Sequence, residues 1–101
     1  MYGRFGRLLA QPGRRAEFTA ILLRAAQLVS ALPGCRQYLV AEDPADDAAI
    51  CVFELWDNAA AHAASLQAEP VRALIGEARP LMAGAASGAE LRVVGGHGLP
   101  R

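Results

Sequence analysis

An amphipathic helix followed directly by a strand–turn–strand segment limits the folds open to this chain. Apolar residues recur with helical spacing over 18–32, and Pro12-Gly13 and Pro33-Gly34 bound that segment. Apolar residues then recur over 35–42 and 49–56, on either side of a turn rich in Asp and Pro. This pattern predicts one helix and then a β-hairpin.

The remaining segments complete a familiar order of elements. Residues 2–10 predict a first strand. Asp57 or Asn58 can cap a short helix that ends near residue 66, and a second helix is predicted over 71–82. Residues 90–94 predict the last strand. The order β-α-β-β-α-β is that of a ferredoxin-like α+β fold, with a four-stranded antiparallel sheet and the helices on one face. A chain of 101 residues has room for one such domain, 1–101.

The two faces of the predicted hairpin differ in polarity. Ala49, Cys51, Phe53 and Leu55 form an all-apolar face, so we expect it to pack against the helices together with Leu91 and Val93. If Leu39 lies opposite Phe53, Tyr38 lies opposite Glu54. The other face would then carry Arg36, Tyr38, Val40, Ile50, Val52, Glu54, Trp56, Arg92 and Val94.

That mixed face is too apolar to remain in water. Such a surface usually closes against a partner, and the simplest partner is a second copy packed sheet to sheet around a cavity. A monomer would leave Trp56, Val52 and Ile50 in water. The same register puts Cys35 and Cys51 roughly 20 Å apart, so we expect buried free thiols and no disulfide.

Composition excludes several functions. Lysine is absent, which excludes Schiff-base chemistry and a phosphate-loop lysine. Ten basic residues balance ten acidic ones, so we expect neither a nucleic-acid nor a membrane partner. No apolar run reaches a membrane-spanning length, and Arg4 and Arg7 interrupt the first apolar stretch, so the cytoplasm is the expected location. We expect no metal, because His62 and His97 are too few for a ligand set, and the acidic turn at 43–47 lacks the ligand spacing of a calcium loop.

Several segments together resemble the antibiotic biosynthesis monooxygenase (ABM) domain family. They cover nearly the whole chain. The segments are Pro12-Gly13-Arg14 with Glu17-Phe18, Pro33-Gly34-Cys35 with Tyr38, Asp43-Pro44, Phe53-Glu54 with Trp56, Ala61-His62 with Ser65-Leu66, 69–75 and 95–99. The last three are similar to bacterial members described as quinol monooxygenases.

The resemblance implies a homodimeric α+β barrel. It also implies oxidation of a quinol or polycyclic phenol by O₂ in a cavity between the helices and the sheet, without a metal, flavin or other cofactor. The alternative is a non-catalytic or stress-associated protein that binds a small aromatic ligand in the same dimeric fold. An aromatic cavity serves either function, so the sequence leaves both open.

Three residues are candidates for catalysis. Trp56 matches a tryptophan that lines the cavity in several family members, and otherwise it is an anchor of the dimer interface. Tyr38 can hydrogen-bond a phenol or move a proton with Glu54, and otherwise the two form a structural cross-strand hydrogen bond. His62 has the right ordinary pKa for a general base, and otherwise it is structural.

Five residues are candidates for substrate binding. Arg36 and Arg92 can attract a phenolate oxygen, or form ion pairs with Glu54 or Glu42. Glu54 and Phe53 complete the expected lining. His97 lies in a glycine-rich tail, and it can also reach a partner subunit if the C-terminal strand does so, as in this family.

Overall fold

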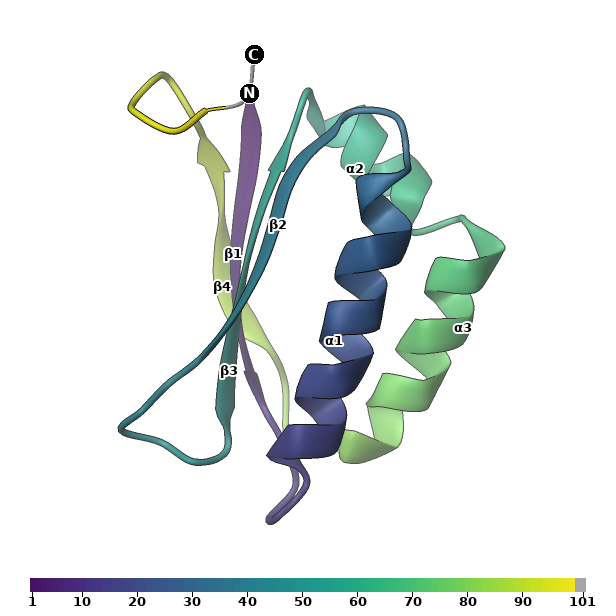
Figure 1. The fold of residues 1–101 in the computed structure, drawn as a ribbon, viewed down its shortest axis with the longest axis vertical. Helices are drawn as coiled ribbons and strands as arrows, with labels where there is room; N and C mark the ends of the chain where they lie inside the picture. The colour runs from purple at the N-terminus through teal and green to yellow at the C-terminus, as the bar shows by residue number, and fades with distance from the viewer. Residues whose placement is uncertain (100–101) are drawn as a thin grey trace.

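The computed structural model describes residues 1–99, and its elements follow the expected order (Figure 1). The short capped helix expected after the hairpin is present as well. The elements are β1 (Tyr2–Leu9), α1 (Arg15–Ser30), β2 (Cys35–Glu42), β3 (Ala49–Trp56), α2 (Ala59–Ser65), α3 (Glu69–Ala78), the 3₁₀ turn η1 (Arg79–Leu81) and β4 (Ser87–Arg92). The last strand thus begins three residues before its predicted start.

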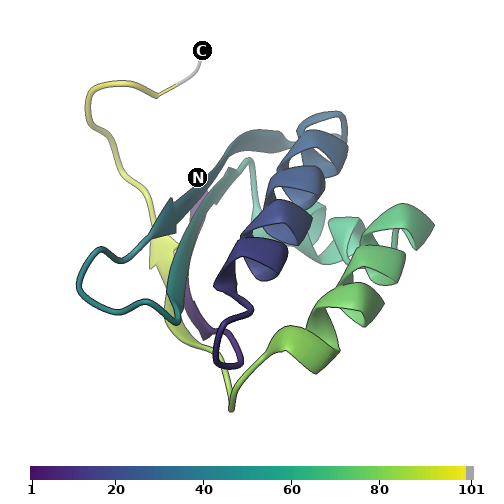
Figure 2. The same cartoon turned by 60° about the horizontal axis from the view of Figure 1, so that its bottom comes forward.

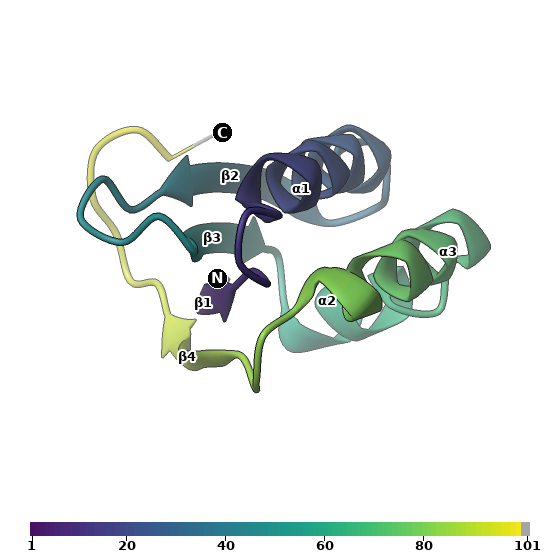
Figure 3. The same cartoon turned by 90° about the horizontal axis from the view of Figure 1, so that it is seen from below.

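The four strands form one antiparallel sheet in the order β2-β3-β1-β4. All the helices lie on one side of it (Figure 3). The ferredoxin-like α+β fold is therefore confirmed. The predicted hairpin register is also confirmed, because Leu39 pairs with Phe53 and Tyr38 pairs with Glu54.

Local sequence signals explain where the helices begin and end. Helix α1 buries Phe18, Leu22 and Val29 along one stripe and stops before Gly34, whose φ of 86° favours glycine. The side chain of Asn58 caps α2 by accepting a hydrogen bond from the backbone N–H of Ala61 at 2.8 Å.

The face assignment of the hairpin was wrong. Ile50, Val52 and Trp56 are buried within the single chain, and they pack on the helix side of the sheet. Leu39 and Leu91 are 57% and 45% exposed on the opposite side. Both faces of β3 offer apolar side chains, so alternation alone does not orient the strand. The observed orientation instead buries the large indole of Trp56 against Val29 and Val71 of the helices.

We call the side of the sheet without helices the open face. It presents Phe5, Leu39, Phe53 and Leu91, of which Phe53 is half-buried. The segment after β4 crosses this side of the sheet (Figure 2). Gln37 Nε2 donates to its Gly98 carbonyl at 3.1 Å. This segment crosses only one end of the open face.

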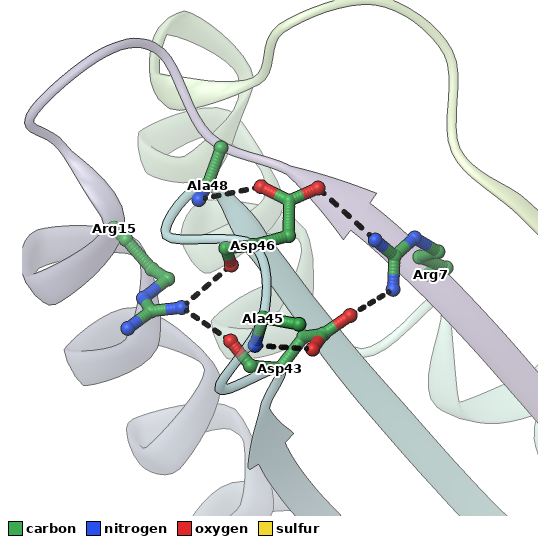
Figure 4. A network of polar contacts seen from close by, with 6 residues as sticks. All are labelled: Arg7, Arg15, Asp43, Ala45, Asp46 and Ala48. Carbon is green, nitrogen blue, oxygen red and sulfur yellow. Dashed lines mark hydrogen bonds and ion pairs between the residues drawn. The ribbon is translucent and has the colours of Figure 1, made fainter.

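The acidic turn between β2 and β3 is held by two arginines (Figure 4). Arg7 of β1 pairs with Asp43 at 3.0 Å and with Asp46 at 3.1 Å. Arg15 of α1 donates to the backbone carbonyls of the same two residues. The carboxylates also accept from Ala45 N and Ala48 N. The turn therefore fastens the hairpin to both neighbouring elements.

Other expectations concern cysteines, metals and membranes. Cys35 and Cys51 are free, as predicted, but they are half-buried instead of buried. Within residues 1–99 no group of three or more His, Cys, Asp or Glu side chains is placed to hold a metal ion. No helix of the described chain has the length and apolarity to cross a membrane.

Candidate functional site

Four polar side chains form one row across the helix side of the sheet. Tyr38 of β2 pairs with Glu54 of β3, which pairs with Arg4 of β1, which pairs with Glu90 of β4. Paired residues in antiparallel strands point to the same face, so the row is a direct product of the register. We call it the polar row.

Two cavities meet at the polar row. A cavity of about 450 Å³ lies over β1 and β4, and one of about 120 Å³ lies between the sheet and helices α1 and α3. Both have Leu22, Tyr38 and Glu54 in their walls. The larger volume falls in the range of small-molecule sites, roughly 300–1,000 Å³. Its polar groups converge where the two cavities join.

Glu54 has one occupied and one free carboxylate oxygen. Oε1 accepts a hydrogen bond from Trp56 Nε1 at 3.1 Å and lies 3.9 Å from His62 Nε2. Oε2 accepts no hydrogen bond from a described residue, and no fully buried side-chain N or O atom in residues 1–99 lacks a partner. Oε2 therefore keeps accessible surface, and the residue lines both cavities. This oxygen can accept a proton from a bound molecule.

Tyr38 presents a hydroxyl to the same space. Its hydroxyl makes no hydrogen bond to any of residues 1–99 and keeps accessible surface. Burial, reinforced by the nearby Glu54 carboxylate, raises the pKa of Tyr38 well above its ordinary value of 10.0. The hydroxyl thus stays protonated at neutral pH and can donate to a ligand oxygen.

Trp56 and His62 stand behind Glu54. Trp56 is fully buried among Val29 and Val71 and is absent from the walls of both cavities. His62 is 8% exposed and packs edge-on against Trp56, with ring centroids 5.7 Å apart. The indole is therefore placed to orient Glu54, while His62 lines the smaller cavity.

A second hydrogen-bonded group anchors the other end of the polar row. Arg4 Nη1 donates to the Tyr2 hydroxyl at 3.0 Å and to Glu90 at 3.2 Å, and Tyr2 donates to Glu90 at 2.8 Å. The hydrogen bond with Tyr2 is the main cause that raises the pKa of Arg4. Arg4 places a fixed positive charge in the wall of the larger cavity, beside Glu54 in the register.

The structure brings together only part of the predicted site. Tyr38, Glu54 and Trp56 share a face, as predicted, but it is the helix side of the sheet, where His62 of α2 joins them. Four others lie apart: Arg36 is bound to Asp57 at 2.6 Å, Phe53 faces the open face, Arg92 is exposed at the end of β4, and His97 is exposed in the tail.

Tyr2, Arg4 and Glu90 belong to the site but were not among the predicted residues. A signal for them was available, because β1 lies between β3 and β4 in a ferredoxin-like sheet. Tyr2 and Arg4 are alternate residues of β1, so they point to one face of the sheet and lie beside the end of β3.

The burial of His62 predicts that the free energy of unfolding depends on pH. Burial lowers its pKa below the ordinary 6.5, with Glu54 opposing and Arg4 assisting the shift. As pH falls below about 6.5, the unfolded chain binds a proton that the folded chain resists, so the free energy of unfolding should fall until the folded pKa is passed. Urea unfolding at pH 7.5 and 5.5 measures this loss. His62→Gln should reduce it, whereas His97→Gln, at an exposed position, should leave it unchanged.

Comparisons with known proteins give a consistent result. The family model described as antibiotic biosynthesis monooxygenase matches residues 1–77. A solved structure of a provisionally named antibiotic biosynthesis monooxygenase from Chloroflexus aurantiacus is similar at 43% identity and a TM-score of 0.89, covering 98% of each chain. Another of that description, from Caulobacter crescentus, is 27% identical, with a TM-score of 0.85 over 93% of this chain and 90% of the other.

A more distant structure shares the fold. SnoaB, described as a cofactor-independent oxygenase from Streptomyces nogalater, is 15% identical with a TM-score of 0.82, covering 96% of each chain. Comparison with curated proteins gave no match.

Proposed function

Because the chain belongs to the antibiotic biosynthesis monooxygenase family, we propose that it oxidises a quinol or polycyclic phenol with O₂, without a metal or flavin. The observation that carries the proposal is the pair of free acceptor and donor atoms, Glu54 Oε2 and the Tyr38 hydroxyl, in the shared walls of the two cavities. The likeness in fold to an oxygenase described as cofactor-independent supports it.

Each group in the polar row has a role in the proposed reaction. The Tyr38 hydroxyl donates to a substrate oxygen, and Glu54 Oε2 takes the substrate proton. The electron-rich anion then reduces O₂, and Arg4 stabilises the negative charge that develops. For a ring CH₂ group the sum is CH₂ + O₂ → C=O + H₂O, so the substrate supplies all the electrons. Trp56 and His62 act as positioning residues for Glu54.

Oxygen uptake tests the proposal. Purified protein is mixed with a panel of hydroquinones, naphthohydroquinones and anthrones, and O₂ consumption is recorded beside product mass. We expect uptake with at least one member and incorporation of one ¹⁸O atom from ¹⁸O₂. Binding without uptake would instead favour the aromatic-ligand-binding alternative. A stoichiometric flavin spectrum or bound iron in the active protein would overturn cofactor independence.

We also propose that the open face is the interface of a homodimer. Its apolar side chains Phe5, Leu39 and Leu91 are 42%, 57% and 45% exposed, and the tail covers only one end of the face. Monomeric proteins rarely leave a contiguous apolar patch of this kind in water. A second copy packed sheet to sheet would bury it, as the barrel expected for this family requires.

Sedimentation measures this assembly. We expect the protein to sediment at twice its chain mass of 10.6 kDa. Leu39→Glu should yield a folded monomer, because a carboxylate on each copy would be desolvated at the interface. Leu23→Glu is the matched control, since Leu23 is 52% exposed on helix α1, away from the open face. A wild-type protein that remains monomeric at micromolar concentration would contradict the dimer.

A further inference from the structure

Two glycines face each other next to the polar row. Gly6 of β1 pairs with Gly88 of β4, and on its other side Gly6 pairs with Val52 of β3. Val52 packs in the core with Phe18 and Leu22 of α1, so this row lies on the helix side of the sheet. Both glycines line the larger cavity. They form a stretch of its floor that carries no side chains.

The fold requires only one of these two glycines. Gly88 has a φ of 155°, and a Cβ there would collide with the Phe5 carbonyl oxygen and lie 3.0 Å from Gly6 Cα. Gly6 has no positive φ, and a Cβ added to it would meet nothing within 4 Å. Glycine weakens a strand interior, and where geometry does not demand it, it often marks the close approach of a ligand. At Gly6 the missing side chain leaves cavity space open.

The distance between the polar row and the glycine row, formed by Gly88, Gly6 and Val52, determines the size of molecule that can cover the glycines. Gly6 lies two residues from Arg4 and Val52 lies two from Glu54, which separates the rows by about 7 Å along the strands. A single ring held at Tyr38 and Glu54 leaves the glycine row uncovered, whereas fused rings reach across it. Leu8, Leu22 and Val52 supply apolar walls on that side.

We infer that Gly6 is a specificity-determining residue that admits fused-ring phenols. The oxygen-bearing ring lies at Tyr38 and Glu54, and the apolar rings lie flat over Gly6 and Gly88. This inference rests on the proposed function for its substrate class. Its physical basis is separate, because a glycine without a backbone requirement opens onto the cavity floor.

Ligands with an increasing number of rings, combined with substitutions of Gly6, test the inference. Anaerobic calorimetry compares hydroquinone, 1,4-naphthohydroquinone and anthrone, which have one, two and three rings. We expect the wild-type protein to bind anthrone most tightly. Gly6→Leu should weaken anthrone binding at least tenfold and change hydroquinone binding less than twofold. Gly76→Leu is the matched control, because Gly76 is exposed on α3 and a Cβ added to it would also meet nothing within 4 Å.

The outcomes separate this inference from the proposed function. If Gly6→Leu weakens all three ligands equally, or none, the specificity role of Gly6 is overturned, while O₂ uptake by the wild-type protein still decides the oxygenase proposal. If affinity follows ring number but no O₂ is consumed, the oxygenase proposal fails and the Gly6 inference holds for a binding protein. Should Gly6→Leu fail to fold, Gly6→Ala decides, with an expected loss of about threefold for anthrone alone.

Discussion

Glu54→Gln should reduce the rate of oxygen uptake by about 10²- to 10⁴-fold, the usual contribution of a positioned general base. The amide keeps the size of the side chain and can still accept from Trp56 Nε1, but it cannot take a proton from the substrate. Substrate affinity should change little, because the Tyr38 hydroxyl and the apolar walls remain. The measurement is kcat and KM by oxygen electrode, with affinity by anaerobic calorimetry.

Glu42→Gln is the matched control for this prediction. Glu42 lies on the helix side of the same sheet, where it pairs with Ile50, but it lines neither cavity. Its loss should leave turnover within twofold of the wild-type value. If Glu54→Gln retained turnover within threefold while binding substrate normally, the base would be another group, and His62 in the smaller cavity would be the next to test.

The sequence predicts the architecture well because its signals are local. Pro-Gly pairs fix the ends of α1, and the turn between β2 and β3 fixes the pairing of Tyr38 with Glu54. It therefore also predicts that Tyr38, Glu54 and Trp56 share a face. Periodicity of two cannot tell which face meets the helices when both carry apolar side chains, as on β3. That choice depends on tertiary partners of Glu54 and Trp56 that are distant in the sequence.

The same limit explains which site residues were missed or misplaced. Arg36 was expected on the same face of the hairpin as Trp56, but the register shifts between Cys35 and Gln37, and the Arg36 side chain pairs with Asp57. Arg4 becomes a site residue only because β1 lies between β3 and β4, which the strand order supplies and composition does not. Gly6 has no motif at all. Its role can be inferred only once the open space next to its Cα is known.

Trp56→Ala should destabilise the single chain by about 3–5 kcal/mol, the usual cost of emptying a large buried aromatic site. Trp56 is fully buried, and its cluster joins α1 through Val29 and α3 through Val71 to the end of β3. Domains of this size typically unfold with about 5–15 kcal/mol, so the variant should lie close to the limit of folding. Urea unfolding followed by circular dichroism measures the loss. Leu23→Ala, at an exposed position of α1 away from the open face, should cost far less.

Trp56→Phe separates the packing role of the indole from its hydrogen bond. Phenylalanine keeps most of the apolar volume but cannot donate to Glu54 Oε1, so the carboxylate loses the group that holds it at 3.1 Å. We expect a folded protein with lower kcat and nearly unchanged KM, because the carboxylate is no longer held in position for the reacting atoms. A stable Trp56→Phe protein with wild-type kcat would show that Glu54 needs no indole to orient it, and Trp56 would then be a packing residue only.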